Sequence, residues 1–234
     1  MFDLESRDRA YIIAEAGTCH AAMNGTDAYH KALIYVLAAA KAGADAVKFQ
    51  MFNAPTYDNM FCWMDGDEER AVRWCASRMP LDSWGLVQKL ANHCDIDLLV
   101  SVFEHTTVQW VKELKMPAVK VASRAALTFP YGELDMPHLV SNGMGSVPPH
   151  REDTVSLQCE ANYPSVRWWD HDLPGFSDHS GTTHRGIDAI ENGCSLVEVH
   201  FYVDPDDAGP DLPASLSVDA LAIICAIRDA QVKL

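Results

Sequence analysis

The sequence lacks three features that would place it in a specialised class of proteins. It contains no C-x-x-C pair, and its seven cysteines are scattered and odd in number, so we expect no disulfide framework and a reducing, cytoplasmic compartment. It has no run of eighteen apolar residues, so we expect no transmembrane helix. Its N-terminus, MFDLESRDR, is charged and has no apolar segment of the kind found in secretory signals.

Positive charge is also scarce in this sequence. The chain has 18 lysines and arginines against 33 aspartates and glutamates, which gives a formal net charge of −15 at pH 7. That balance argues against general binding to nucleic acid or to an anionic membrane surface. A local pocket for an anion remains compatible with it, because a few lysines in a cleft dominate the field there.

What the sequence does contain is an alternation of short apolar runs with helical patterns. Strand candidates lie near residues 12, 47, 99, 120, 140, 156, 176 and 198, and helical patterns follow most of them. Eight such units in 234 residues predict a single α/β domain over residues 1–234, a (β/α)8 TIM barrel. The segments after the fourth, fifth and sixth strands are short, so we expect a minimised barrel with some outer helices shortened to loops.

Two histidines mark the carboxyl ends of two neighbouring strand candidates. His179 ends the run GFSDH and His200 ends the run LVEVH, with a helical pattern between them. In a parallel barrel these two ends face the same way and lie side by side. A lone histidine is more often structural, but two imidazoles at one edge suit a divalent metal that keeps open positions for water and substrate.

The other predicted strand ends carry an unusual share of lysines and hydroxyl groups for an acidic protein. Lysine supplies charge to a phosphate or carboxylate, and hydroxyl groups supply directed hydrogen bonds. A carboxylate beside them would be the natural base or would orient a water molecule. The residues at these positions are Glu15, Lys48, Gln50, Ser101, Lys120, Ser123, Ser141, Asn162, Ser177 and Glu198.

Several motifs along the chain occur in the order in which a known family carries them. Residues 11–20 (YIIAEAGTCH) resemble I-A-E-x-G-x-N-H, and residues 42–50 (AGADAVKFQ) nearly repeat a second-strand motif. Further matches are VKVAS at 119–123, SNGM at 141–144, NYP at 162–164, FSDH at 176–179, EVHF at 198–201 and GPDLPASL at 209–216. Together these motifs resemble the sialic acid synthase (N-acetylneuraminate synthase) family, over the barrel from about residue 11 onward.

This resemblance implies a transferase of carbohydrate biosynthesis that condenses phosphoenolpyruvate with the aldehyde of an open-chain sugar. The product would be a 2-keto acid such as a sialic acid-type sugar, and phosphate would be released. A divalent metal, manganese or magnesium, would sit on His179 and His200. The resemblance assigns phosphoenolpyruvate to Lys48, Ser101, Lys120, Ser123, Ser141, Asn162 and Ser177, proton transfer or water orientation to Glu15, and the acceptor or metal side to Gln50, Glu198 and Asp211.

The chain also departs from the family in ways that concern the acceptor. The family usually carries a C-terminal antifreeze-like domain, which we expect to be missing here. Arg124-Ala125 stands where the family has G-E or G-D, and Leu212-Pro213 stands where it commonly has His-Lys. We therefore expect the family's chemistry with an altered acceptor, and Arg124 suggests an anionic one. The acidic run at residues 65–69 is interpreted as a solvated loop.

Other interpretations stay open at this point. Lys48 or Lys120 could form a Schiff base in an aldolase, although two histidines and a hydroxyl cradle are unnecessary for that chemistry. A shrunken, non-catalytic barrel could bind a phosphorylated ligand or a protein partner. The shortened helices also predict exposed apolar barrel surface, covered either in a homo-oligomer or by a loop that contains Trp168 and Trp169.

Overall fold

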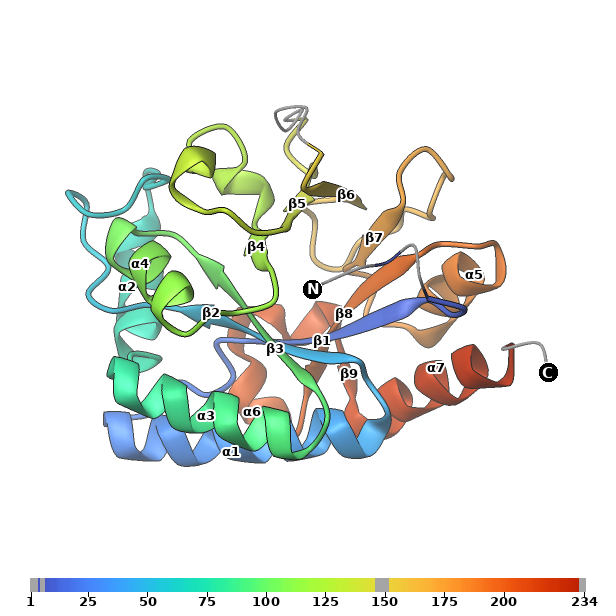
Figure 1. Cartoon of the computed structure of the whole chain (residues 1–234), viewed down its shortest axis with the longest axis horizontal. Helices are drawn as coiled ribbons and strands as arrows, with labels where there is room; N and C mark the ends of the chain where they lie inside the picture. The colour runs from blue at the N-terminus through green and yellow to red at the C-terminus, as the bar shows by residue number, and fades with distance from the viewer. Residues whose placement is uncertain (1–3, 5–6, 146–151, 232–234) are drawn as a thin grey trace.

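A closed parallel barrel forms the body of the chain. The computed structural model describes residues 4, 7–145 and 152–231. In this part of the chain, eight parallel strands follow one another in chain order, and β1 also pairs with β8, which closes the barrel (Figure 1). The strands are β1 Tyr11–Gly17, β2 Ala46–Met51, β3 Asp97–Val102, β4 Val119–Val121, β5 His138–Ser141, β6 Thr154–Cys159, β7 Gly175–Asp178 and β8 Leu196–Tyr202. The predicted (β/α)8 barrel is confirmed.

Helices cover the barrel unevenly. The long ones are α1 Gly25–Ala42, α3 Leu81–His93 and α7 Val218–Ala230, and α1 contacts both of the others. Shorter ones are α2 Asp67–Ala76, α4 His105–Glu113, α5 Thr183–Glu191 and α6 Pro205–Ala208, with 3-10 turns at η1 Ser123–Ala125, η2 Tyr131–Glu133 and η3 Gly209–Ala214. A short ninth strand, β9 Ser215–Ser217, which the sequence did not predict, pairs with β8. None of the described helices is long and apolar enough to cross a membrane.

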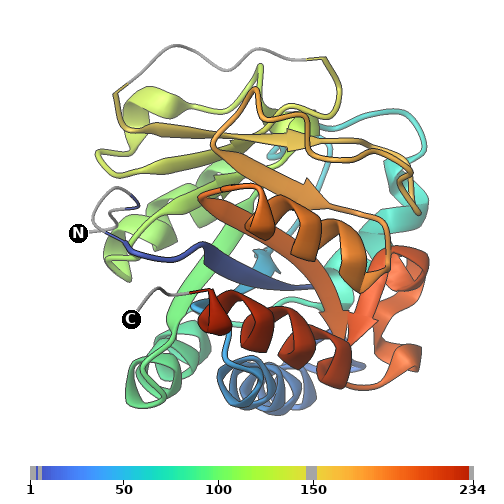
Figure 2. The ribbon, with the colours of Figure 1, turned by 90° about the vertical axis from the view of Figure 1, so that its right-hand side faces the viewer.

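The side of the barrel around β5 and β6 is the thin one, as expected from the short connections. Figure 2 shows strands and loops on that side, whereas α1, α3 and α7 lie on the opposite side. The outward side chains of β6 include Ser156 and Gln158, which are polar. Gln158 donates to the carbonyl of Trp168 and accepts from the amide of Asp170.

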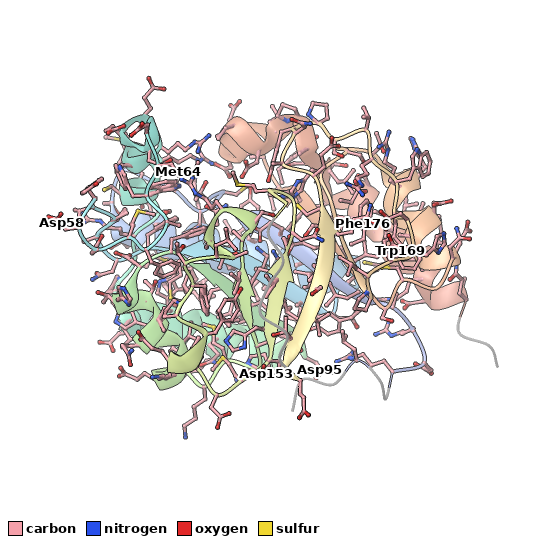
Figure 3. All side chains as sticks on the ribbon, turned by 90° about the horizontal axis from the view of Figure 1, so that it is seen from above. Asp58, Met64, Asp95, Asp153, Trp169 and Phe176 are labelled. Atoms are coloured by element: carbon pink, nitrogen blue, oxygen red, sulfur yellow. The ribbon has the colours of Figure 1, made fainter. Side chains whose placement is uncertain are left out.

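The tryptophan-containing loop therefore covers part of the thin side. Trp169 is 8 % exposed, belongs to the main apolar core and lies near Phe176 of β7 (Figure 3). Since the bare strand is polar and the loop folds over it, the structure favours the loop over the homo-oligomer as the cover of this side. The homo-oligomer itself stays a prediction.

The two ends of the barrel differ in character. Asp95 and Asp153, which precede β3 and β6, lie at one end of the strands, and Met64 lies at the other end (Figure 3). The barrel interior towards the amino ends of the strands is filled by an apolar layer of Tyr11, Ile13, Ala46, Leu99, Ala118, Leu139, Leu157 and Leu196. Because this layer fills the barrel, a site must lie on its other side, which we call above, at the carboxyl ends of the strands.

His20 is a buried anchor between the barrel and its helices, and it is not available for nucleophile activation. Its Nε2 lies 2.9 Å from the carbonyl oxygen of Ser77, and the rings of Phe49 and Trp84 pack edge-on against it. Burial lowers the pKa of His20 to about 4, because a charged imidazole would lose its hydration. The neighbouring Cys19 thiol is also buried, which raises its pKa to about 12 and argues against a catalytic cysteine.

The burial of His20 predicts a pH-dependent stability. As the pH falls from about 6.5 towards 4, His20 takes up a proton in the unfolded chain but stays neutral in the folded protein. The free energy of unfolding therefore decreases in this pH range. His20 contributes up to about 1.4 kcal/mol per pH unit to the slope of the unfolding free energy against pH. Denaturant titrations at several pH values should show a shallower slope for His20→Gln, which keeps a donor for the Ser77 carbonyl. Equal slopes in both proteins would contradict this account.

Candidate active site

A polar layer lies directly above the apolar layer. Interior side chains recur every second residue along a strand, so the next interior position above Ile13 is Glu15, and above Leu99 it is Ser101. At this interior position each of the eight strands carries a polar residue or a cysteine, whereas two residues earlier it carries an apolar residue or glycine. The layer consists of Glu15, Lys48, Ser101, Lys120, Ser141, Cys159, Ser177 and Glu198, and every member is buried. Seven of these eight residues were predicted as strand-end candidates, and Cys159 was missed.

Two lysines and two glutamates form the charged centre of this layer. Lys48 Nζ lies 2.7 Å from Glu15 Oε2 and 3.6 Å from Glu198 Oε2. Lys120 Nζ lies 3.7 Å from Glu198 Oε1. The four groups thus alternate in sign, which is how charges are kept stable in a buried site.

Serine hydroxyl groups connect these charges. Lys48 donates to Ser101 Oγ over 2.9 Å, and Lys120 donates to Ser141 Oγ over 2.7 Å. The Ser141 and Ser177 hydroxyls lie 3.0 Å apart, and Ser177 donates to Glu198 Oε1 over 2.9 Å. The layer is therefore a continuous hydrogen-bonded cradle whose donors can turn towards a bound anion.

The pKa values of the two glutamates are shifted in opposite directions. Burial raises the pKa of Glu15 to about 7, even though Lys48 opposes the shift. Burial would also raise the pKa of Glu198, but Lys120 and Lys48 outweigh it and lower that pKa to about 2. Near neutral pH, Glu198 is therefore a fixed negative charge, whereas Glu15 can hold or give up a proton.

Above the polar layer, small residues occupy three of the next interior positions. The next interior positions on β1, β5 and β6 lead to Gly17, Gly143 and Ala161. The Gly143 amide donates to Ser123 Oγ over 2.9 Å. A Cβ on Gly143 would lie 3.0 Å from both Cys159 Sγ and Ser123 Oγ. The positions of the Ser123 hydroxyl and the Cys159 thiol thus depend on the absence of a side chain at position 143.

Gly143→Ala should weaken the binding of an anion in the cradle. The added methyl would displace the Ser123 hydroxyl and the Cys159 thiol, so we expect Kd or KM for the anionic substrate to rise about tenfold, equivalent to about 1.4 kcal/mol. Calorimetry with phosphoenolpyruvate would measure the change. Gly132→Ala is the matched control, because a Cβ there meets no atom within 4 Å. Equal affinities in both variants would contradict the assignment of this cradle.

His179 directly follows β7 and His200 lies in β8, so the two histidines lie at neighbouring strand ends, as the sequence predicted. Their ring centroids are 5.1 Å apart. His179 Nδ1 lies 2.6 Å from the carbonyl oxygen of Glu160, so it donates there, and the lone pair of Nε2 faces the Tyr163 hydroxyl at 3.4 Å. Burial and the neighbouring His179 lower the pKa of His200 well below its usual value, which keeps it neutral. No group of three or more candidate metal ligands occurs among the described residues.

This donor set fits a catalytic metal that takes two protein ligands. A carbonyl that fixes the tautomer of a ligating histidine is a typical outer partner of such sites. The remaining positions would go to water or substrate, which a Lewis acid needs. Tyr163, which sequence reasoning missed, stacks on His179 with centroids 4.4 Å apart and lies edge-on to His200 at 5.6 Å. It shields both rings from solvent.

Asp211 and Gln50 converge between the histidines and Glu15. Asp211 Oδ2 lies 3.9 Å from His200 Nδ1. A Cβ on Gly17 would lie 3.3 Å from Asp211 Oδ2, 3.6 Å from Glu15 Oε1 and 3.7 Å from Gln50 Nε2. The predicted residues Asp211, Glu15 and Gln50 thus lie close together around Gly17. Asn162 does not join them, since its exposed amide donates to Glu160 Oε1.

The acidic run at 65–69 is exposed as expected except at Asp67, and it begins a helix instead of forming a loop throughout. Asp67, in the acidic run, is fully buried at the start of α2 and accepts a hydrogen bond from the backbone amide of Met64. The Arg124 guanidinium pairs with Asp67 and also donates to the Cys62 carbonyl. Because its charge is neutralised in this way, Arg124 gives no support to an anionic acceptor.

Comparison with known proteins gives a consistent result. The family model described as the NeuB family matches residues 35–168 and 166–234. The chain is 28% identical over 261 residues to an N,N'-diacetyllegionaminic acid synthase of Legionella pneumophila, covering 94% of this chain and 72% of the relative. It is 27% identical over 251 residues to the N-acetylneuraminate-9-phosphate synthase of Homo sapiens, covering 91% and 67%.

A solved structure with the same fold supports the architecture. The chain superimposes with a TM-score of 0.76 on an N-acetylneuraminic acid (sialic acid) synthetase from Leptospira borgpetersenii serovar Hardjo-bovis. The two sequences are 22% identical, and the match covers 95% of this chain and 83% of that one. At that identity the likeness concerns the fold.

Proposed function

Because the chain belongs to the NeuB family, we propose that it condenses phosphoenolpyruvate with the aldehyde group of an open-chain sugar. The C3 carbon of phosphoenolpyruvate bonds to the aldehyde carbon, whose oxygen takes a proton and becomes a hydroxyl. Water adds to C2, and the bond between C2 and the phosphate oxygen breaks. The products are a 2-keto sugar acid and inorganic phosphate, in keeping with the sugar acid synthases among its relatives.

The observation that carries this proposal is the buried polar layer beneath the paired histidines. A phosphoenolpyruvate anion needs positive charge and several directed donors in one place. Lys120, Ser141 and Ser177 supply these on one side of the layer, and the Lys120–Ser141 bond is already 2.7 Å long. Ser123, whose hydroxyl accepts from the Gly143 amide, is proposed to contact the phosphate group.

Glu15 is proposed to handle the proton of the attacking water. Its carboxylate lies 2.7 Å from Lys48 Nζ and next to Gly17, between the cradle and the acceptor side. Its raised pKa, about 7, suits a group that takes a proton in one step and returns it in another. Glu198 stays ionised and holds both lysines in place for the substrate.

The acceptor aldehyde is proposed to bind beside His179, His200, Gln50 and Asp211. A divalent metal held by the two histidines would polarise the aldehyde oxygen and stabilise the alkoxide charge that develops there. Tyr163, stacked on His179, covers the site and limits the access of bulk water.

Phosphate release tests the proposal directly. The protein would be incubated with phosphoenolpyruvate, Mn²⁺ and a panel of aldoses, with and without N-acetyl groups, and products would be identified by mass spectrometry. Acceptor-dependent phosphate release together with a product of the summed mass minus phosphate is expected. Binding of phosphoenolpyruvate without turnover on any acceptor would favour a non-catalytic barrel. Neither binding by calorimetry nor phosphate release would refute both functions.

A further inference from the structure

A short segment after β8 carries Asp211 across the mouth of the barrel. We name residues 205–214, which comprise α6 and η3, the strap. Asp211 of the strap approaches the candidate site, with Oδ2 3.9 Å from His200 Nδ1. In the described part of the chain the strap pairs with no strand before β9 begins at Ser215, so its contacts with neighbouring segments hold it in position.

Arg73 on α2 makes the contacts that join the strap to the β1 end of the site. Its Nε donates to Thr18 Oγ1 over 2.7 Å and its Nη2 donates to the Thr18 carbonyl over 3.2 Å. The same Nη2 also donates to the carbonyl of Asp207 in the strap. Thr18 follows Gly17, the glycine over which Asp211 lies. One guanidinium thus bridges the two segments that meet at the Asp211 carboxylate.

The strap is shaped to receive this guanidinium. A Cβ on Gly209 would lie 2.6 Å from both Cζ and Nη1 of Arg73, and Gly209 has φ +56 and ψ −131, a conformation that side chains strongly disfavour. Arg73 therefore lies flat against bare backbone, two residues before Asp211. A second tie, the ion pair of Lys31 with the Asp207 side chain, joins the strap to α1 and does not reach the mouth.

We propose that Arg73 is a positioning residue for the acceptor side of the site. It clamps the strap to Thr18, and through that clamp it holds the Asp211 carboxylate between His200 and Glu15. This inference rests on the proposed function for its catalytic consequence, while the clamp itself is a property of the fold. Arg73 touches neither the lysine cradle nor the serine hydroxyls.

The arrangement predicts which kinetic constants change. Arg73→Gln should lower kcat about tenfold or more and raise KM for the acceptor, because outer partners of a site typically contribute 10- to 100-fold. KM for phosphoenolpyruvate should stay within about twofold, since its cradle lies on other strands. Arg73→Lys keeps the charge but lacks the planar guanidinium with its several N–H donors, so it should retain only part of the activity that Arg73→Gln loses. A general loss of structure would instead change both KM values together.

Thr18 and Arg70 supply the matched variants. Thr18→Val removes the hydroxyl acceptor of Arg73 but keeps both carbonyl acceptors, whereas Thr18→Ser keeps all three, so Thr18→Val should reproduce part of the Arg73→Gln phenotype and Thr18→Ser none of it. Thr18→Val should add little to Arg73→Gln in the double variant, because Arg73→Gln already breaks the bond that Thr18→Val removes. Arg70→Gln is the charge control, since Arg70 lies one turn earlier on α2, has a 63% exposed side chain and, among the described residues, pairs with Asp67.

Amide hydrogen exchange tests the clamp without relying on activity. In Arg73→Gln, the strap amides should exchange at least about tenfold faster than in the wild type and in Arg70→Gln, and Thr18→Val should give a smaller increase, while β2 and β3 amides are unchanged. Unaltered strap exchange, or equal changes in both KM values, would overturn the inference. If the wild type releases no phosphate with any acceptor, the proposed function fails, and strap exchange alone then decides whether Arg73 is the clamp.

Discussion

Lys120→Met is expected to lower acceptor-dependent phosphate release by about 10²–10³-fold, the loss typical of removing one preorganised electrostatic group. Lys120 is 3% exposed and donates to Ser141 over 2.7 Å. Methionine has a similar length and no charge, so it fills the space but offers no donor to phosphoenolpyruvate. Steady-state phosphate release and calorimetric titration with phosphoenolpyruvate would measure the loss, which should appear in both.

The same substitution should also destabilise the fold. Lys120→Met leaves the Glu198 carboxylate with Lys48 as its remaining cation, at 3.6 Å, and Lys48 is already paired with Glu15 at 2.7 Å. Breaking a buried pair by removing one partner costs about 3–5 kcal/mol. The loss should shrink as the pH falls, because Glu198 then takes up a proton more readily than it does beside two lysines.

The double variant Lys120→Met with Glu198→Gln separates stability from activity. It replaces a buried ion pair by two neutral side chains of similar size, so the free energy of unfolding should recover most of its loss. Phosphate release should not recover, because the donor to the anion is still missing. Recovery of activity with stability would mean that Lys120 acts only as a counter-ion for Glu198, and the anion cradle would have to be placed elsewhere.

The polar layer could be predicted because it obeys a local rule. Along each strand an apolar residue or glycine is followed two positions later by a residue of the polar layer on the same face, so the predicted strand ends correctly placed Glu15, Lys48 and Glu198 together. Cys159 obeys the same rule and was missed because a cysteine in a scattered set carries no chemical signal of its own. The barrel order followed in the same way from the alternation of strands and helices.

The acceptor side could not be predicted because long-range contacts determine it. Nothing local shows that Arg124 reaches Asp67, 57 residues earlier, or that Arg73 reaches Asp207, 134 residues later. The strap position depends on the Arg73 contact and on Gly209, whose role appears only when the Arg73 guanidinium lies against it. Asn162 was predicted both from its place after a strand and from its motif, but its side chain donates to Glu160 instead.

Chelation is expected to abolish phosphate release without unfolding the protein. The two imidazoles are the only predicted protein ligands, and His179 is already oriented by the Glu160 carbonyl at 2.6 Å, so the site does not need the metal to form. A Lewis acid that stabilises a developing alkoxide contributes several kcal/mol, so activity should fall by at least about 10²-fold in EDTA. Thermal unfolding of chelated and Mn²⁺-loaded protein should differ little.

Histidine variants identify where the metal acts. His200→Gln should lose activity to the same extent as chelation and should not respond to added Mn²⁺ or Mg²⁺, whereas His93→Gln, an exposed residue at the end of α3, should behave as the wild type. Binding of phosphoenolpyruvate should persist in both, since its proposed ligands lie in the lysine and serine layer. Full activity in EDTA would remove the metal from the proposal, and the paired histidines would then have to polarise the aldehyde by hydrogen bonding alone.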